Sequence, residues 1–234
     1  MTDFHDWKSC DTPALESAEG RFVRLGPARF HEDAAALFDA IGGPGNDDLW
    51  TYIPFGPLEM AEAFSAAMTF VIGQQNWETV LIRAVDTGEV RGMASYMRIR
   101  PEHGSAEVGC IIFSKKLQRT PAATEAMYLM ARHIFEARGY RRYEWKCHNG
   151  NLASRRAANR FGFVFEGVFR QDQVMKGQNR DTAWYSITDG EWPQVKSAFE
   201  TWLAPENFDG EGRQRKTLSK IRDLHTPHPE APIR

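Results

Sequence analysis

Two polar residues, Asn151 and Ser154, stand one helical turn apart at the entrance of a predicted short helix. This helix runs from Ser154 to Arg160 and ends in an aromatic–Gly–aromatic step, with Gly162 in the position that favours a left-handed backbone. Polar side chains at a helix entrance either cap free backbone N–H groups or face a ligand. Capping is the favoured interpretation from these residues alone, and ligand contact is the alternative.

A second candidate site lies at residues 118–124, between the end of a predicted strand and a long helix. Small residues at such a joint let backbone N–H groups approach a ligand, and the N-terminus of a helix attracts an anion such as pyrophosphate. Pro121 has no N–H to offer, and proline is also an ordinary first residue of a helix. On spacing alone, a plain strand–helix joint is the favoured interpretation.

The predicted strand over residues 106–113 carries one carboxylate, Glu107, in an otherwise apolar sequence. Such a carboxylate needs a partner or a function, and pairing with an arginine and a catalytic role are equally open. Regular alternation predicts two faces for this strand. One face holds Glu107, Gly109, Ile111 and Phe113, and the other holds Val108, Cys110 and Ile112.

Composition limits the class of protein. Of 234 residues, 42% are hydrophobic and 26% charged, as in a globular domain with a sizeable core. The formal net charge of −2 argues against a nucleic-acid-binding protein, which carries a basic excess. No apolar run has the length of a membrane span, and the acidic first twenty residues lack the apolar segment of a secretory signal.

The cysteines indicate the compartment. Cys10, Cys110 and Cys147 are odd in number and widely spaced, so they form neither a disulfide framework nor a zinc pattern. His148 beside Cys147 lacks the spacing of metal ligands, and a structural role is favoured for it. We therefore expect no metal site and a reducing, cytoplasmic environment.

The order of predicted elements, β-α-α-β-β-β-α-β-α-β-β, indicates one α/β domain around a mixed sheet. Residues 1–20 are predicted to form a loose arm, residues 21–203 the domain, and residues 204–234 a mobile polar tail. The predicted strands are 21–25, 79–85, 90–99, 106–113, 142–147, 163–175 and 182–187. The predicted helices are 32–41, 58–72, 121–138, 154–160 and 191–203.

The string of Asn151, Ser154, Phe161-Gly162-Phe163 and Glu166-Gly167 resembles the end of the GNAT acyltransferase domain, in its RimJ/RimL-like branch. The resemblance covers about residues 21–203. It implies a GNAT-like α/β fold, in which a mixed β-sheet with splayed central strands is flanked by helices. It also implies an N-acetyltransferase that moves an acetyl group from acetyl-CoA to an amine, without a metal.

The resemblance assigns roles to the residues described above. The GNAT signature Q/R-x-x-G-x-G/A, which holds the coenzyme A pyrophosphate, is matched by Gln118, Pro121 and Ala123, with Pro121 departing from the usual Gly. The pantetheine arm fits between the splayed strands. The implied coenzyme-binding residues are Ile111, Phe113, Gln118, Arg119, Thr120, Pro121, Ala122, Ala123, Thr124, Asn151 and Ser154.

The resemblance also implies catalytic residues. Glu107 matches the position of an acid residue that often serves as base, and Ser154 that of the proposed proton donor to the departing thiolate. The branch has another base, a Glu nineteen residues after this Ser. The present chain has Gln173 there, so that base is missing. The neighbouring Asp172 is expected to face the opposite side of its strand. The backbone N–H groups near Ile111 or Ile112 are expected to hold the oxyanion.

The acceptor is expected to be a small-molecule amine or a protein N-terminus, and neither nucleic acid nor a membrane. An aromatic loop with Trp50, Tyr52 and Phe55 forms one wall of the acceptor site or only covers the core. The polar segment 176–186 forms the other wall or is only a hairpin with a strand-edge interface, and Gln173 is also expected to bind the acceptor. The basic residues between 138 and 160 are interpreted mainly as a solvated face, with one or two meeting the 3′-phosphate of coenzyme A.

Two other classes of protein stay open at this point. Pro121 and Gln173 motivate a non-catalytic acyl-CoA-binding regulatory module. The polar tail and the paired-strand edge motivate a structural partner protein, and a homodimer is the assembly considered.

Overall fold

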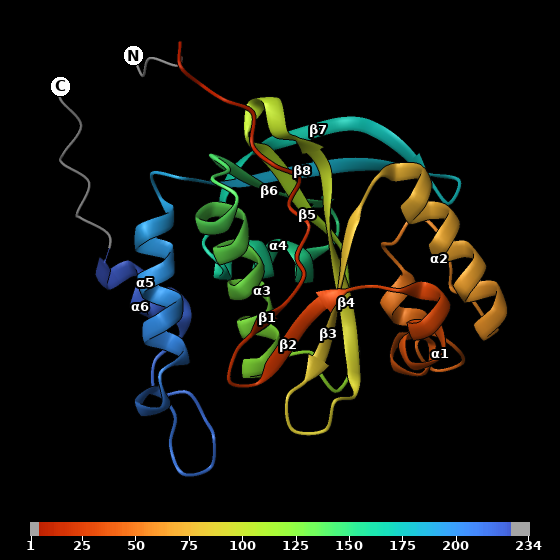
Figure 1. Cartoon of the computed structure of the whole chain (residues 1–234), viewed down its shortest axis with the longest axis horizontal. Coiled ribbons are helices and arrows are strands. Elements are labelled where there is room, and N and C mark those ends of the chain that lie inside the picture. The colour runs from red at the N-terminus through yellow and green to blue at the C-terminus, as the bar shows by residue number, and fades with distance from the viewer. Residues whose placement is uncertain (1–4, 226–234) are drawn as a thin grey trace.

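The computed structural model describes residues 5–225. Eight strands form one sheet in the order β1-β2-β3-β4-β5-β6-β8-β7 (Figure 1). All neighbouring strands are antiparallel except β5 and β6, which are parallel. The strands are β1 (Ala18–Glu19), β2 (Val23–Pro27), β3 (Glu78–Ala84), β4 (Val90–Arg100), β5 (Ser105–Phe113), β6 (Arg142–His148), β7 (Val164–Met175) and β8 (Gln178–Thr188).

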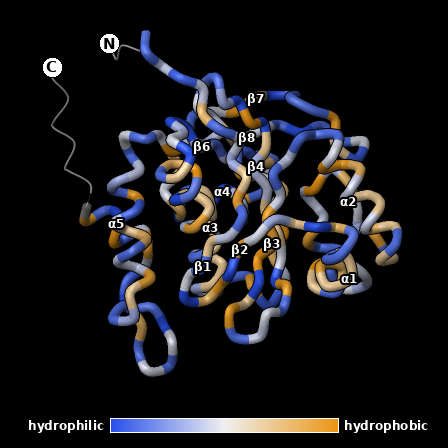
Figure 2. The backbone as a smooth tube through the Cα atoms, viewed as in Figure 1, coloured by the Kyte–Doolittle hydropathy of each residue, from blue (hydrophilic) through white to orange (hydrophobic). Residues whose placement is uncertain are grey.

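Helices cover both faces of the sheet and create two cores. In Figure 1, α1 and α2 lie to one side of the central strands, and α3, α5 and α6 lie to the other. Figure 2 shows apolar stretches along α1, α3 and β3, whose buried side chains belong to these cores. The helices are α1 (Phe30–Ile41), α2 (Ala61–Gln75), α3 (Pro121–Arg132), α4 (Leu152–Arg160), α5 (Trp192–Leu203) and α6 (Leu218–His225).

The central parallel pair splays apart. Strands β5 and β6 pair only from Ser105 opposite Arg142 to Val108 opposite Trp145. Beyond this point, β5 stays with β4 and β6 stays with β8. The sheet therefore opens at its centre, as the splayed arrangement expected from the sequence requires.

A β-bulge in β5 overturns the predicted alternation of its side chains. The register with β4 shifts between Met93 and Ser95, and Cys110 adopts a left-handed backbone with φ of 46°. As a result, Ile111 packs with Val108 against the core beneath α3, whereas Cys110 packs against the core beneath α1 and α2. The prediction that Glu107 and Ile111 share one face is therefore wrong, because an extra residue in a strand reverses the faces that follow it.

Helix α3 is anchored at its start. Thr120 is its N-cap, and the side-chain oxygen of Thr120 accepts a hydrogen bond from the Ala123 N–H at 3.3 Å. One turn later, the buried carboxylate of Glu125 accepts backbone N–H groups of residues 21–23 at 2.6–2.9 Å. These three bonds satisfy a buried charge and fix α3 against the start of β2.

Strands β7 and β8 form a hairpin with a two-residue turn. Met175 pairs with Gln178, and the turn residues Lys176 and Gly177 have φ of 49° and 75°. Two positive φ values identify the turn type that matches the twist of paired strands. The hairpin predicted from the sequence is thus present, with a β8 that starts earlier than expected.

Both chain ends differ from the expected loose segments. In the described part of the arm, Leu15 is buried and the carbonyl of Ala14 accepts a hydrogen bond from Arg138 Nη2 at 2.7 Å. The predicted mobile tail folds back as α6, and its Leu218 and Ile221 join the core against α5. No helix was predicted here, because the apolar face of α6 is short and lies in a polar sequence. Residues 1–4 and 226–234 lie outside the described residues.

Candidate active site

A cleft of about 1240 Å³ opens where β5 and β6 separate. Of the predicted site residues, only Trp50 and Ala122 are absent from its lining. The predicted residues that line it are Tyr52, Phe55, Glu107, Ile111, Phe113, Gln118, Arg119, Thr120, Pro121, Ala123, Thr124, Asn151, Ser154 and Gln173. The splay therefore brings together residues from the aromatic loop, β5, α3, α4 and β7.

Trp50 belongs to the core instead of the cleft, which corrects its place in the predicted acceptor wall. Its side chain is 1% exposed, and its Nε1 donates a hydrogen bond to the Ile41 carbonyl at 2.7 Å. Its ring packs edge-on against Phe64 of α2. Ala122 likewise packs against the core beneath α3. The alternative interpretation, that this aromatic residue covers the core, is correct for Trp50.

The start of α3 offers few free backbone donors to an anion. The Ala123 N–H is held by Thr120, and Pro121 has no N–H. A side chain supplies positive charge here: Arg160 of α4 donates a hydrogen bond to Thr124 Oγ1 at 3.0 Å. Its guanidinium also lies 5.0 Å from the ring centroid of Trp202. Burial lowers the pKa of Arg160, which places this cation in a poorly hydrated setting.

Asn151 and Ser154 lie on the same cleft at the start of α4. Asn151 is the N-cap, and its Oδ1 accepts the Ser154 N–H at 3.0 Å, so the capping interpretation holds for Asn151. The Ser154 Oγ accepts a hydrogen bond from Trp145 Nε1 at 3.0 Å. The indole uses a lone pair of the hydroxyl, so the Ser154 O–H remains a donor. Burial raises the pKa of the neighbouring Cys147 thiol, and a hydrogen bond from Ser154 partly offsets this rise.

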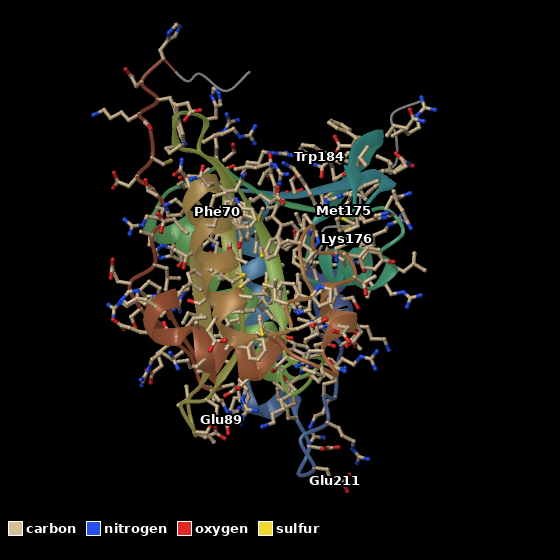
Figure 3. All side chains as sticks on the ribbon, turned by 90° about the vertical axis from the view of Figure 1, so that its right-hand side faces the viewer. Phe70, Glu89, Met175, Lys176, Trp184 and Glu211 are labelled. Atoms are coloured by element: carbon tan, nitrogen blue, oxygen red, sulfur yellow. The ribbon has the colours of Figure 1, made fainter. Side chains whose placement is uncertain are left out.

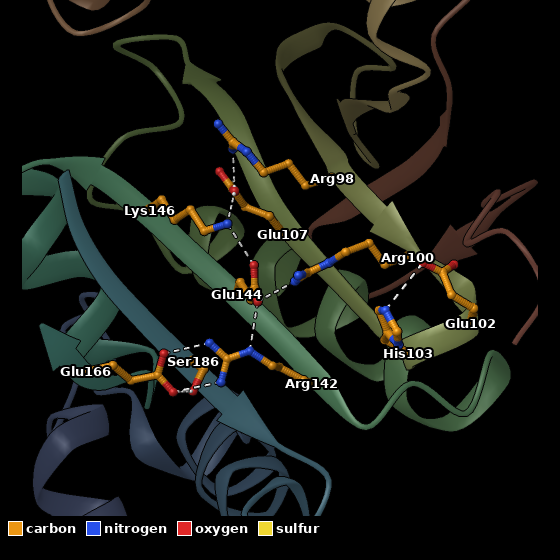
Figure 4. Close-up of polar contacts among 10 residues, drawn as sticks. All are labelled: Arg98, Arg100, Glu102, His103, Glu107, Arg142, Glu144, Lys146, Glu166 and Ser186. Carbon is orange, nitrogen blue, oxygen red and sulfur yellow. Dashed lines mark hydrogen bonds and ion pairs between the residues drawn. The ribbon is translucent and has the colours of Figure 1, made fainter. Parts of the chain in front are cut away.

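Glu107 is buried beside two cations. Its side chain, 4% exposed, forms an ion pair with Arg98 and lies 3.2 Å from Lys146 Nζ. Lys146 is equally buried, bridges to Glu144 Oε2 at 2.8 Å, and places its ammonium 3.7 Å from the centroid of the Trp184 ring. Figure 4 shows this run of alternating charges across β4, β5 and β6. Both cations stabilise the negative charge of Glu107.

The charge run continues away from the cleft. Glu144 receives hydrogen bonds from Arg100 at 2.7 Å and Arg142 at 2.8 Å, and Arg142 holds both oxygens of Glu166 (Figure 4). Burial alone would raise the pKa of Glu144, but bonds from Arg142 and Lys146 outweigh it and lower that pKa to about 2. The hydrogen bonds with Glu166 and Glu144 raise the pKa of Arg142 against its burial.

The prediction that the basic residues form a solvated face is wrong for Arg142 and Lys146 of β6, which are engaged in ion pairs. The signal for their position is in the sequence of β6, where Arg142, Glu144 and Lys146 alternate with Tyr143 and Trp145. This period of two puts opposite charges side by side on one face. Sequence reasoning also missed Arg98 and Lys146 as residues that line the cleft, whereas Arg180 belongs to the segment 176–186 that was predicted to be either an acceptor-site wall or a plain hairpin.

The outer end of the cleft is bounded by the aromatic loop and the β7–β8 hairpin. The Tyr52 hydroxyl donates a hydrogen bond to the Gly150 carbonyl at 3.3 Å, and the Tyr52 ring lies 5.4 Å from that of His148. Lys176 at the hairpin tip donates to the Trp50 carbonyl at 2.9 Å. Figure 3 shows Met175, Lys176 and Trp184 on this side of the molecule.

A mixed sheet that splays at its parallel pair, with a cleft running from a helix N-terminus to a buried carboxylate, defines an acyltransferase of the GNAT fold. The acetyltransferase (GNAT) domain profile matches residues 23–164. A crystal structure of a GCN5-related N-acetyltransferase from Brucella melitensis is 42% identical, covers 94% of this chain and 99% of that chain, and superposes with a TM-score of 0.90. The chain belongs to the GNAT family of acetyltransferases.

Two further comparisons concern enzymes that modify ribosomal proteins. The ribosomal-protein-serine acetyltransferase of Escherichia coli (strain K12) is 28% identical over 98 residues, which are 42% of this chain and 54% of that protein. The chain thus spans about half the length of this relative. A structure of RimL, a ribosomal L7/L12 alpha-N-protein acetyltransferase in complex with coenzyme A, is 20% identical, covers 72% of this chain and 95% of that one, and has a TM-score of 0.61, which shows likeness of fold alone.

Two kinds of feature are absent from residues 5–225. No helix there is long and apolar enough to cross a bilayer. No group of three or more His, Cys, Asp or Glu side chains is arranged to hold a metal ion in that range.

Proposed function

We propose that this chain transfers an acetyl group from acetyl-CoA to a primary amine, which belongs to a protein N-terminus or to a small molecule. The observation that carries the proposal is one continuous cleft that reaches from the start of α3 past Ser154 to Glu107. The relative that acetylates a ribosomal protein supports a protein amino group as acceptor. The three free cysteines support action in a reducing compartment such as the cytoplasm.

The cleft suits an extended thioester with a charged head. Arg119, Arg160 and the N-terminus of α3 provide positive potential for the pyrophosphate or the 3′-phosphate. The splayed edges of β5 and β6 leave backbone groups free to bond the amide-bearing pantetheine arm. Pro121 has no backbone N–H to donate to a phosphate, and the guanidinium of Arg160 partly replaces this missing donor.

The reaction needs a neutral amine, a stabilised oxyanion and a leaving thiolate. A free α-amine titrates near ~7.7–8.0, so a substantial share is neutral at physiological pH, whereas a lysine-type amine near ~10.4 is not. The bulge at Cys110 and Ile111 takes backbone N–H groups out of regular pairing with β4, where they can face the oxyanion. The Ser154 O–H, oriented by Trp145, donates to the thiolate as it leaves.

Glu107 is placed to receive the amine proton, directly or through a water. Arg98 and Lys146 hold its carboxylate beside the cleft. Asp172 is an unsuitable replacement because it is exposed on the face of β7 opposite the half-buried Gln173. A neutral α-amine depends on a protein base less than a protonated lysine-type amine does.

The test is thiol release from acetyl-CoA by the full chain, measured across a panel of amines, with mass spectrometry of the acceptor. We expect stoichiometric release of thiol and a mass increase of one acetyl group on a primary amine. The competing hypothesis, a non-catalytic acyl-CoA-binding module, makes the opposite prediction. Tight acetyl-CoA binding in calorimetry with no release above background for any amine would support that module.

A further inference from the structure

The acceptor end of the cleft carries more positive than negative charge. Three cationic side chains line it, Arg98, Lys146 and Arg180. Two carboxylates line the same end, Glu107 and Asp48, and Asp48 pairs with a lysine outside the cleft at 3.1 Å. Arg98 and Lys146 are both engaged with Glu107. The charge of Arg180 therefore has no matching carboxylate among the described residues that line the cleft.

Arg180 is poorly satisfied by the protein. Its Nη1 lies 3.8 Å from the Met175 sulfur, a weak acceptor, and its buried Nε has no hydrogen-bond partner within residues 5–225. No ion pair to Arg180 occurs among those residues either. Burial lowers the pKa of Arg180, only partly offset by the more distant charges of Glu107 and Asp172. An unpaired, half-buried guanidinium is costly unless a ligand completes it.

The residue opposite Arg180 explains why it is unpaired. Gln173 on β7 is the register partner of Arg180 on β8, and both line the cleft. A carboxylate at position 173 would neutralise the guanidinium, but the Gln173 amide does not. The strand pair thus presents a cation and a neutral amide to the acceptor, a combination that recognises a carboxylate by a charge-assisted hydrogen bond.

We infer that the acceptor amine carries a carboxylate close to its amino group, and that Arg180 binds this carboxylate. The inference rests on the proposed acetyl transfer and narrows its substrate class. Two sources supply the same chemistry: the α-carboxylate of a free amino acid, and an acidic side chain next to the N-terminus of a peptide. Polyamines are disfavoured, because their second cation would meet Arg98, Lys146 and Arg180.

The experiment compares matched acceptors that differ only in the carboxylate. One arm uses serine against serinamide, and the other uses C-terminally amidated peptides that begin Ser-Asp or Ser-Asn. Each is assayed for kcat/KM with the wild-type chain and with Arg180→Gln, Gln173→Glu and Arg170→Gln. Arg170 is the matched control, because it is an exposed arginine on the same hairpin and does not line the cleft.

We expect the wild-type chain to prefer the anionic member of at least one pair. Loss of a charged hydrogen bond predicts that Arg180→Gln lowers kcat/KM for that member by about tenfold to hundredfold. The neutral member and the KM for acetyl-CoA should stay unchanged, and Arg170→Gln should behave as wild type. Gln173→Glu should reproduce the loss by occupying Arg180, without removing the guanidinium.

The arm that shows the preference identifies the source of the carboxylate. Equal kcat/KM for the paired acceptors, together with an unchanged ratio in Arg180→Gln, would overturn the inference while leaving acetyl transfer intact. Absence of turnover with every amine would instead count against the proposed function. A greater loss on the neutral members than on the anionic ones would also overturn the role assigned to Arg180.

Discussion

The indole Nε1 of Trp145 donates a hydrogen bond of 3.0 Å to the hydroxyl oxygen of Ser154. This contact joins Trp145, the last residue of β6 that pairs with β5, to the first turn of α4 at the splay of the sheet. It positions the Ser154 oxygen and leaves the hydroxyl as a donor beside Cys147. A group oriented in this way can donate to a thiolate without reorganising during the reaction.

Replacement of Ser154 by Ala should therefore lower kcat by about 10²–10⁴-fold, the usual contribution of a general acid. Acetyl-CoA affinity should change little, because the backbone cap from Asn151 remains. The measurement is steady-state kinetics beside calorimetry of acetyl-CoA binding. Ser17→Ala, at an exposed position away from the cleft, is the matched control. An unchanged kcat in Ser154→Ala would assign Ser154 to structure alone.

Replacement of Glu107 by Gln should lower kcat by about 10²–10⁴-fold, the usual contribution of a general base. The amide keeps the shape of the side chain but cannot accept a proton from an ammonium. The measurement is steady-state kinetics with acetyl-CoA and a panel of amines, beside calorimetry of acetyl-CoA binding. Glu102→Gln, an exposed neighbour outside the cleft, should keep the wild-type kcat.

A different outcome for Glu107 is informative. If the variant keeps the wild-type rate, then Glu107 serves to hold Lys146 and Arg98 in place. The amine proton would then pass to solvent without a protein base. An α-amine suits this route because its pKa of about 7.7–8.0 lies near physiological pH.

Ala123→Asp should weaken acetyl-CoA binding. Ala123 lines the cleft in the first turn of α3, so a carboxylate there would oppose the phosphates. Ala123→Asn has nearly the same shape without the charge, and it separates repulsion from bulk. We expect calorimetry to give a larger loss of affinity for Asp than for Asn, with similar thermal unfolding of both. Equal affinities for the two variants would place the phosphates elsewhere.

Most helices and strands could be predicted from the sequence because periodicity and turn residues are local signals. The long helix predicted over 121–138 is present as α3 and a continuing π-helical segment, His133–Ala137. The bulge at Cys110 was not readable, since nothing in an apolar strand marks which residue adopts a positive φ. The helix α6 was hidden because its apolar stripe consists of few residues in a polar sequence.

The coenzyme end of the site was predictable where the family signature reaches, and Tyr52 and Phe55 were predicted from the aromatic content of their loop. Gln118, Pro121, Asn151 and Ser154 follow motif positions, and the structure places all four on one cleft. Arg180 and Lys146 enter the cleft through long-range pairing of β6 with β8 and of β8 with β7. The alternation in β6 puts Lys146 and Glu144 on one face, but it does not show which strands lie beside β6. Burial of Lys146 depends on Glu144 of its own strand and on Glu107 of the neighbouring strand β5, and the contact with Glu107 forms only once β5 and β6 are paired.

The core contact of α6 predicts that Leu218→Ala destabilises the protein. Leu218 is 2% exposed, and a Leu→Ala change at a buried position typically costs about 2–5 kcal/mol. Leu224 on the same helix is 73% exposed, so Leu224→Ala is the matched control and should have little effect. Urea denaturation measures both. Equal free energies of unfolding for the two variants would mean that α6 does not pack against α5 in solution.

The last prediction concerns stability at low pH. The pKa of Glu144 is about 2 in the folded chain against an ordinary value of 4.5, because bonds from Arg142 and Lys146 outweigh the effect of burial. A lowered folded-state pKa means that Glu144 stabilises the fold fully above pH 4.5 and loses this contribution as the pH falls toward 2. The shift corresponds to at most about 3 kcal/mol of unfolding free energy.

Urea denaturation between pH 7 and pH 3 should therefore show a wild-type free energy of unfolding that declines below pH 4.5. In Glu144→Gln the free energy should be lower at pH 7, since Lys146 and Arg142 lose a partner, and it should decline less with acid. The difference between the two chains should thus shrink as the pH falls. Glu59→Gln, at an exposed loop position, should track the wild type throughout. A constant difference across the range would mean that Glu144 does not titrate with the fold.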